Sequence, residues 1–171
     1  SHPHAWVVLG GLSASGFARE ILESFPDVDV IVRGDAEQPL LELVQHLLAA
    51  PDRSTALAGL NQISNLTYST PDGVIENELG YTASTQDLDH LDYVDLSFLD
   101  HSREYLVHEY VVTDLPMARQ ALNTDPFLGR WITTARGCKY ECAYCGGCKS
   151  AHKLLAGRNG IVSRSPEIVV N

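Results

Sequence analysis

The sequence predicts an α/β fold, because strand and helix patterns alternate along its first fifty residues. Residues 5–9 are a continuous apolar run, and residues 28–32 form a second, largely apolar one. Apolar residues at helical spacing follow each run, the second time over residues 37–49. This order implies parallel strands with helices on both faces. We therefore expect a partial doubly wound, Rossmann-like sheet at the start of the chain.

Each of these elements has its own boundary signals. The first strand ends at Gly10 and Gly11, and the helix that follows has a serine cap and is stopped by Pro26. The second strand ends at Gly34. Ligands of such sheets bind at the carboxyl ends of the strands, where these glycines lie. A glycine after a strand is more often only a tight turn, so this signal is weak when taken alone.

The middle of the chain is less regular. Residues 66–70 and 74–77 flank a Pro-Asp-Gly turn and predict a β-hairpin, which we interpret as a small edge ribbon without chemistry. Residues 81–129 carry many acidic side chains. We interpret them as a solvated interdomain linker with some short helix and strand.

Three cysteines, Cys138, Cys142 and Cys145, have C-x3-C-x2-C spacing directly after a predicted strand at residues 130–137. Thiols this close can converge on one metal centre. An iron–sulfur cube normally takes four thiolates, so three would leave one iron open for a substrate or cofactor. A catalytic zinc site keeps one position open in the same way.

A fourth cysteine, Cys148, leaves an alternative open. If it bound as well, the loop would be a non-catalytic module holding structural zinc or a closed electron-transfer cluster. Structural zinc sites usually pair two cysteines with a distant second pair, yet all four cysteines here lie within residues 138–148. We interpret Cys148 as a bystander.

The motif C-x3-C-x-aromatic-C, with Tyr144 in the aromatic position, resembles that of the radical S-adenosylmethionine (SAM) superfamily. The resemblance implies an enzyme in which Cys138, Cys142 and Cys145 hold a [4Fe–4S] cluster as metal ligands. It also implies that the open iron binds SAM, and that Tyr144 packs near the adenine or the cluster. Family members use an electron donor such as flavodoxin or ferredoxin.

The segments VVLGG and VDVIVRGDAEQPLLELV resemble the cobalamin-binding domain that precedes many radical SAM domains. There, a glycine pair lets the nucleotide tail of the cofactor approach the backbone, which implies that Gly10 and Gly11 are cofactor-binding. The resemblance implies an enzyme that carries out methyl transfer or a radical rearrangement on an unknown substrate, with cobalamin as a candidate cofactor. Methylthiotransferases, radical SAM enzymes with a different first domain, are a further alternative that these segments disfavour.

Taken together, these resemblances imply three segments. We expect residues 1–50 to be the C-terminal half of a cobalamin-type domain and residues 51–129 to be the hairpin and acidic linker. Residues 130–171 would begin a partial (β/α) radical SAM barrel, with a helix starting near Ser165. We expect a fragment of a longer enzyme that is inactive by itself.

Charge is unevenly distributed along the 171 residues, whose formal net charge is −10. Lys and Arg are outnumbered in residues 1–129 but predominate in residues 130–171. The acidic excess argues against a nucleic-acid partner. No apolar run reaches about 18 residues, so we expect no membrane span. We expect a cytoplasmic protein whose substrate is a small molecule or peptide.

Overall fold

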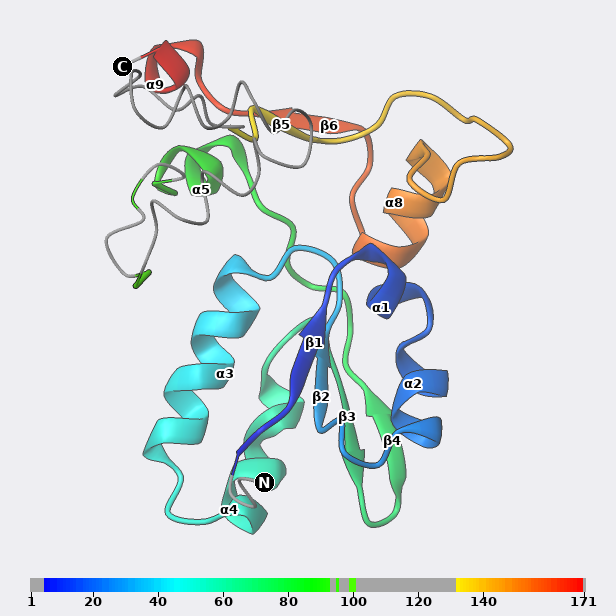
Figure 1. Ribbon diagram of the computed structural model, residues 1–171, viewed down its shortest axis with the longest axis vertical. Helices are drawn as coiled ribbons and strands as arrows, with labels where there is room; N and C mark the ends of the chain where they lie inside the picture. Colours follow the sequence, from blue (N-terminus) through cyan, green and yellow to red (C-terminus); the bar gives the residue numbers. More distant parts are fainter. Residues whose placement is uncertain (1–4, 93–94, 96–98, 101–131, 171) are drawn as a thin grey trace, which may run out of the picture.

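The computed structural model describes residues 5–92, 95, 99–100 and 132–170, and its larger body is a four-stranded sheet with helices on both faces (Figure 1). The strands lie in the order β1 (Val8–Gly10), β2 (Val30–Val32), β3 (Leu66–Thr70) and β4 (Gly73–Glu76). β1 and β2 are parallel, whereas β3 is antiparallel to β2 and to β4. This mixed sheet confirms the predicted α/β class.

Helices pack on the two faces of the sheet in agreement with the alternating side chains of β2. Val30 and Val32 contact a cluster that includes Leu43 of α3 (Glu37–Ala49). Ile31 points to the other face, into a cluster formed by α1 (Leu12–Gly16) and α2 (Ala18–Ser24). Successive side chains of a strand point to opposite faces, so β2 is buried on both. A further helix, α4 (Arg53–Gly59), leads through a 3-10 turn (Leu60–Gln62) into β3.

The predicted helix after the first strand exists, but its cap and continuity differ from the prediction. It is broken at Phe17 into α1 and α2, and Gly11, not a serine, is the residue before α1. Ser15 lies inside α1, where its hydroxyl donates to the Gly11 carbonyl oxygen at 2.9 Å and accepts from the Gly34 N–H at 2.9 Å. Its side chain therefore joins α1 to the end of β2 instead of capping the helix. The helix predicted over residues 37–49 has the predicted bounds.

The predicted hairpin is confirmed, but it is not a separate ribbon. Leu66 and Tyr68 of β3 belong to the same buried cluster as Val30 and Val32. Only β4 lies at the edge of the sheet. The sheet therefore continues across residue 50 and takes part of its core from the hairpin.

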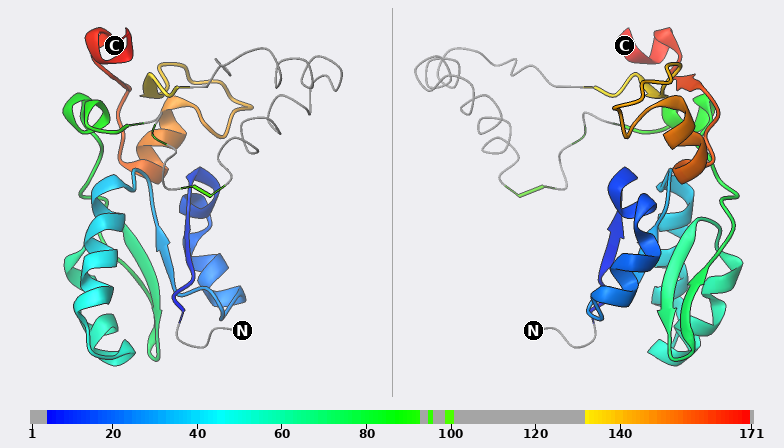
Figure 2. Two further views of the ribbon diagram at one scale, coloured as in Figure 1. Left: turned by 60° about the vertical axis from the view of Figure 1, so that its left-hand side comes forward. Right: turned by 90° about the vertical axis from the view of Figure 1, so that its right-hand side faces the viewer.

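A smaller region lies beyond the carboxyl ends of β1 and β2 (Figures 1 and 2). It contains β5 (Ala135–Gly137), α8 (Lys149–Ala156), β6 (Ile161–Ser163) and α9 (Pro166–Val170). The predicted strand is thus found only at its end, and residues 130–131 lie outside the described residues. The predicted helix start near Ser165 is confirmed. The prediction contained neither α8 nor β6, which pairs antiparallel with β5.

A short helix from the acidic stretch also belongs to this smaller region. This helix, α5 (Thr85–Asp89), begins with a capping box between Ser84 and Asp87. Its last residue, Asp89, accepts hydrogen bonds from the N–H and hydroxyl of Ser165 at 2.8 and 2.6 Å. The rest of the predicted linker lies mainly outside the described residues. Within the described part of the chain, no helix has the length and apolar character needed to span a membrane.

Candidate functional site

The cysteine loop runs from the end of β5 to the start of α8. Two contacts close it: the Lys149 N–H donates to the Tyr140 carbonyl oxygen at 2.8 Å, and Ser150 donates to the Glu141 carboxylate through its N–H at 3.1 Å and its hydroxyl at 2.5 Å. These hydrogen bonds with Ser150 lower the pKa of Glu141, so its carboxylate stays ionised at the first turn of α8. The loop is therefore closed by its own polar groups.

All four cysteines are free thiols on this loop. Cys138, Cys142 and Cys148 are half-buried and Cys145 is exposed. The Cys145 N–H donates to the Cys142 carbonyl oxygen at 3.1 Å, and the Cys148 N–H donates to the Cys145 carbonyl oxygen at 3.3 Å. The same backbone turn therefore joins Cys142 to Cys145 and Cys145 to Cys148. By this measure the backbone of Cys148 does not differ from that of Cys145. The Tyr140 N–H donates to the sulfur of Cys138 at 3.4 Å.

The thiols share a loop but do not form a closed coordination sphere. Among the described residues, no three Cys, His, Asp or Glu side chains are placed to hold one metal ion. The donor set itself, four accessible sulfurs within eleven residues, fits a thiolate-bound metal group. Tyr144 is 93% exposed and does not pack against the loop. That Cys138, Cys142 and Cys145 bind a cluster, and that Tyr144 packs beside it, stay predictions.

The predicted glycine turn lies next to the cysteine loop. Gly11 has φ +92° and is exposed, and a Cβ built on it would meet no atom within 4 Å. A ligand could therefore approach the backbone there. A Cβ built on Gly147 would lie 3.9 Å both from Leu12 Cδ2 and from the sulfur of Cys145. The structure thus brings the two predicted cofactor sites together, although they are more than 120 residues apart in sequence.

An ion-pair network that the sequence analysis missed joins the sheet to the cysteine segment. Asp35, buried after β2, accepts from Arg158, from Arg136 at 3.3 Å and from the Ala83 N–H at 2.9 Å. Arg158 also donates to the Ala83 carbonyl oxygen at 2.9 Å, and Arg136 lies 2.5 Å from a carboxylate oxygen of Glu37. No local pattern identifies these residues, because the partners of Asp35 are 48 to 123 positions away.

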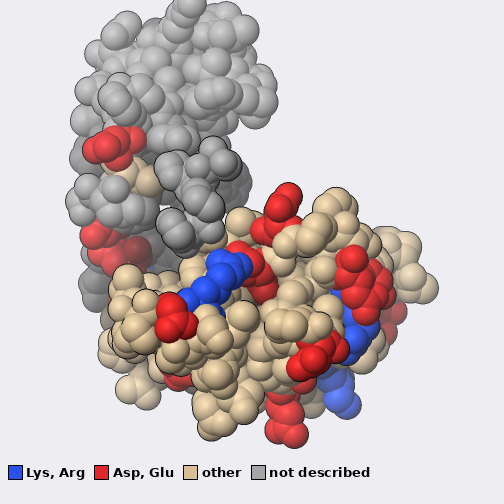
Figure 3. Space-filling view, turned by 90° about the horizontal axis from the view of Figure 1, so that it is seen from below, with Lys and Arg blue, Asp and Glu red and all other residues tan. Residues whose placement is uncertain are grey.

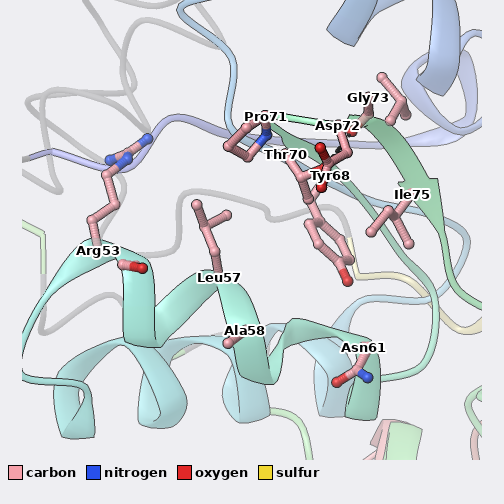
Figure 4. Close-up of a pocket in the computed structure, with 12 residues that line it drawn as sticks. Arg53, Leu57, Ala58, Asn61, Tyr68, Thr70, Pro71, Asp72, Gly73 and Ile75 are labelled. Atoms are coloured by element: carbon pink, nitrogen blue, oxygen red, sulfur yellow. Dashed lines mark hydrogen bonds between the residues drawn. The ribbon is translucent and has the colours of Figure 1, made fainter.

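A separate cavity of about 640 Å³ lies between α4 and the β3–β4 hairpin, at the end of the sheet away from the cysteines (Figure 4). It contains none of the predicted site residues. Burial raises the pKa of Tyr68, which lines it, so the phenol stays protonated at neutral pH. Arg53 at its rim stacks on the Trp6 ring at 4.1 Å and pairs with Asp29.

On the face drawn in Figure 3, acidic side chains outnumber basic ones among the described residues.

Comparisons with known proteins found two distant relatives, and both are enzymes. The chain is 27% identical over 146 residues to an anaerobic magnesium-protoporphyrin IX monomethyl ester cyclase of Rubrivivax gelatinosus, which covers 84% of this chain and 22% of the relative. It is 26% identical over 143 residues to the enzyme of the same name from Cereibacter sphaeroides, covering 84% and 20%. The chain therefore spans about a fifth of the length of these relatives. No family model matches the chain, and no solved structure matches it with significance.

Proposed function

We propose that this chain is a segment of a radical SAM enzyme, in which Cys138, Cys142 and Cys145 hold a [4Fe–4S] cluster. The observation that carries this proposal is the accessible loop of free thiols with C-x3-C-x2-C spacing. The similarity to two cyclases supports it, because their names describe enzymes that act anaerobically and iron–sulfur clusters are oxygen-sensitive. When bound, the cluster would supply the electron that cleaves SAM reductively.

The residues of the chain would hold and orient these groups. The three cysteines would bind the cluster as thiolates, and the positive charges of Lys139 and Lys149 beside them would offset the negative charge of such a group. The same lysines suit the carboxylate of SAM. Tyr144, in its exposed position, would pack against the adenine or the cluster once these are bound. We further propose an electron donor such as flavodoxin or ferredoxin, a cytoplasmic location, and a small molecule or peptide as substrate.

Cobalamin is the second cofactor that we propose. The open backbone at Gly11, with Gly10 before it, supports a ligand that lies over the carboxyl edge of β1. The cysteine loop beside this turn would place such a ligand close to the cluster. Equilibrium dialysis of hydroxocobalamin against a longer protein that contains this chain checks the proposal. Absence of binding there would remove methyl transfer from the proposed chemistry.

A non-catalytic metal module is the second candidate function. It is favoured by the repeated turn that relates Cys142, Cys145 and Cys148, since this turn gives Cys148 the same backbone setting as a predicted ligand. In that case all four sulfurs would bind zinc or a closed electron-transfer cluster.

Anaerobic reconstitution with iron and sulfide separates the two candidates. We expect a brown protein with about four iron atoms per chain. Alanine at position 138, 142 or 145 should abolish the cluster absorbance, whereas the matched variant Cys148→Ala should retain it. A colourless zinc protein, or loss of the cluster in Cys148→Ala, would favour the closed module. In a longer protein with an open iron, adding SAM should also shift the electron paramagnetic resonance spectrum of the reduced cluster.

A further inference from the structure

One carboxylate fastens both ends of the cysteine-bearing segment to the sheet. Arg136 precedes the first cysteine by two residues, and Arg158 follows the end of α8 by two. Both arginines donate to Asp35, which lies three residues beyond the end of β2. The two ends of the segment formed by residues 137–157 are therefore both held at the Asp35 side chain.

The Asp35 network is a buried, specific contact at the junction. Arg158 is 6% exposed and Asp35 is 8% exposed, so the charges need each other as partners. The oxygen of Asp35 that accepts from Arg158 also accepts from the Ala83 N–H, and Arg158 in turn donates to the Ala83 carbonyl oxygen. Glu37 supplies a second carboxylate for Arg136. Charge-assisted hydrogen bonds of this kind fix both distance and direction.

Apolar packing at the same junction buries few side chains completely. Ala156 is the buried apolar residue of the described part of residues 132–170. It lies against Gly34, where a built Cβ would come within 2.9 Å of the Ala156 Cα. Such a contact sets how closely α8 approaches β2. The helix α8 also packs against α1, where a Cβ built on Gly16 would lie 3.5 Å from Leu155 Cδ1. These contacts limit the distance of α8 from the sheet, whereas the charge-assisted hydrogen bonds to Asp35 also fix the direction of the segment.

We propose that Asp35 is a positioning residue, which holds the cysteine loop in place beside the Gly10–Gly11 turn through Arg136 and Arg158. The functional meaning of this placement rests on the proposed function, because the position of the loop would set the distance between the cluster and a ligand at the edge of the sheet. The placement itself is a property of the chain without metal.

Hydrogen–deuterium exchange of the full, metal-free chain tests the placement. Asp35→Asn should raise exchange of amides in residues 138–157 by about tenfold or more, while the amides of β2 and β3 keep their protection. The matched control is Asp29→Asn, at the other end of β2. Asp29 is also a carboxylate paired with an arginine, Arg53, and its loss should leave residues 138–157 unchanged.

A second pair of variants keeps the test decisive if Asp35→Asn unfolds the chain. Arg136→Gln leaves the buried Asp35–Arg158 pair intact and should raise exchange in the same segment by a smaller factor. Arg19→Gln is its control, because Arg19 lies on α2 and pairs with Glu76 of the edge strand β4, outside the Asp35 network. Unchanged exchange of residues 138–157 in Arg136→Gln, or a rise that is equal in sheet and loop, would overturn the proposal.

Iron content separates a failure of this proposal from a failure of the proposed function. After reconstitution, Arg136→Gln should lose iron to a chelator several-fold faster than the native chain, and Arg19→Gln should not. A native chain that takes up no iron would overturn the proposed function, while the exchange result still decides the role of Asp35. A native chain that takes up iron, with equal loss from both variants, would count against Asp35 as a positioning residue.

Discussion

The four-stranded sheet buries apolar side chains on both faces, whereas the region that carries the cysteines buries hardly any. Seven residues of the main cluster, from Val30 to Tyr68, are at most 6% exposed. In residues 132–170 none of the larger apolar side chains is fully buried, and several are exposed, such as Leu154 at 77% and Ile161 at 52%. Polar contacts to Asp35 attach this region to the sheet, and Asp89 of α5 holds the start of α9. The sheet therefore holds itself together, while the cysteine region depends on ion pairs, caps and, by our proposal, a bound cluster.

The largest expected effect is the loss of an apolar side chain from the sheet. Leu43 is fully buried in α3, so Leu43→Ala should lower the free energy of unfolding by about 2–5 kcal/mol, since it leaves a cavity in a packed core. Leu154→Ala on α8 is the matched control and should change it by about 0.5 kcal/mol or less. Urea unfolding followed by circular dichroism measures both. Similar losses in the two variants would mean that the two regions share one core.

A smaller effect is expected where the two regions meet. Gly34 has φ +69°, and a built Cβ would lie 2.9 Å from the Ala156 Cα, so Gly34→Ala combines backbone strain with a steric clash. It should destabilise the docking of α8 by about 2 kcal/mol. In Gly16→Ala the new Cβ would meet Leu155 at an ordinary 3.5 Å and should be tolerated. Exchange of the α8 amides measures the docking, and equal behaviour of the two variants would contradict the close contact between α8 and the end of β2.

Metal loading should stabilise the cysteine region and leave the sheet unaffected. A ligand that binds only the folded loop lowers the population of its open forms. Trypsin should therefore cleave after Lys139 and Lys149 about tenfold more slowly in the reconstituted protein than in the metal-free one. Cleavage after Arg19, on α2, should be unchanged. Cys142→Ala treated in the same way should gain no protection; protection in that variant would show that the metal binds elsewhere.

The same division explains how much could be predicted from the sequence. Apolar periodicity and turn residues are local signals, and they predicted the strands β1 and β2, the helix over residues 37–49 and the hairpin, but not that the hairpin belongs to the same sheet. The cysteine spacing likewise singled out the loop. Asp35 and Arg158 escaped prediction because their contact spans 123 positions and neither residue belongs to a recognisable motif. The helix α8 was missed since Cys148, the residue before it, makes no side-chain capping bond and looks like part of the loop.

The smallest expected effect concerns Asp89, which attaches α5 to the start of α9. Hydrogen bonds from the hydroxyl and N–H of Ser165 lower the pKa of Asp89 below 3.8. The unfolded chain therefore binds this proton more readily, so the contribution to stability is present above about pH 3.8 and is lost as pH falls through the lower folded pKa. The chemical shift of the Ser165 amide should follow this titration with a midpoint below 3.8.

The matched variant Ser165→Ala removes the hydroxyl donor. The midpoint followed on the same backbone amide should then rise towards 3.8, because the carboxylate keeps only the hydrogen bond from the backbone N–H. A native midpoint at or above 3.8 would mean that Asp89 does not hold Ser165 in solution, and that the cysteine region is attached to the sheet by the Asp35 network with less help from α5 than the geometry indicates.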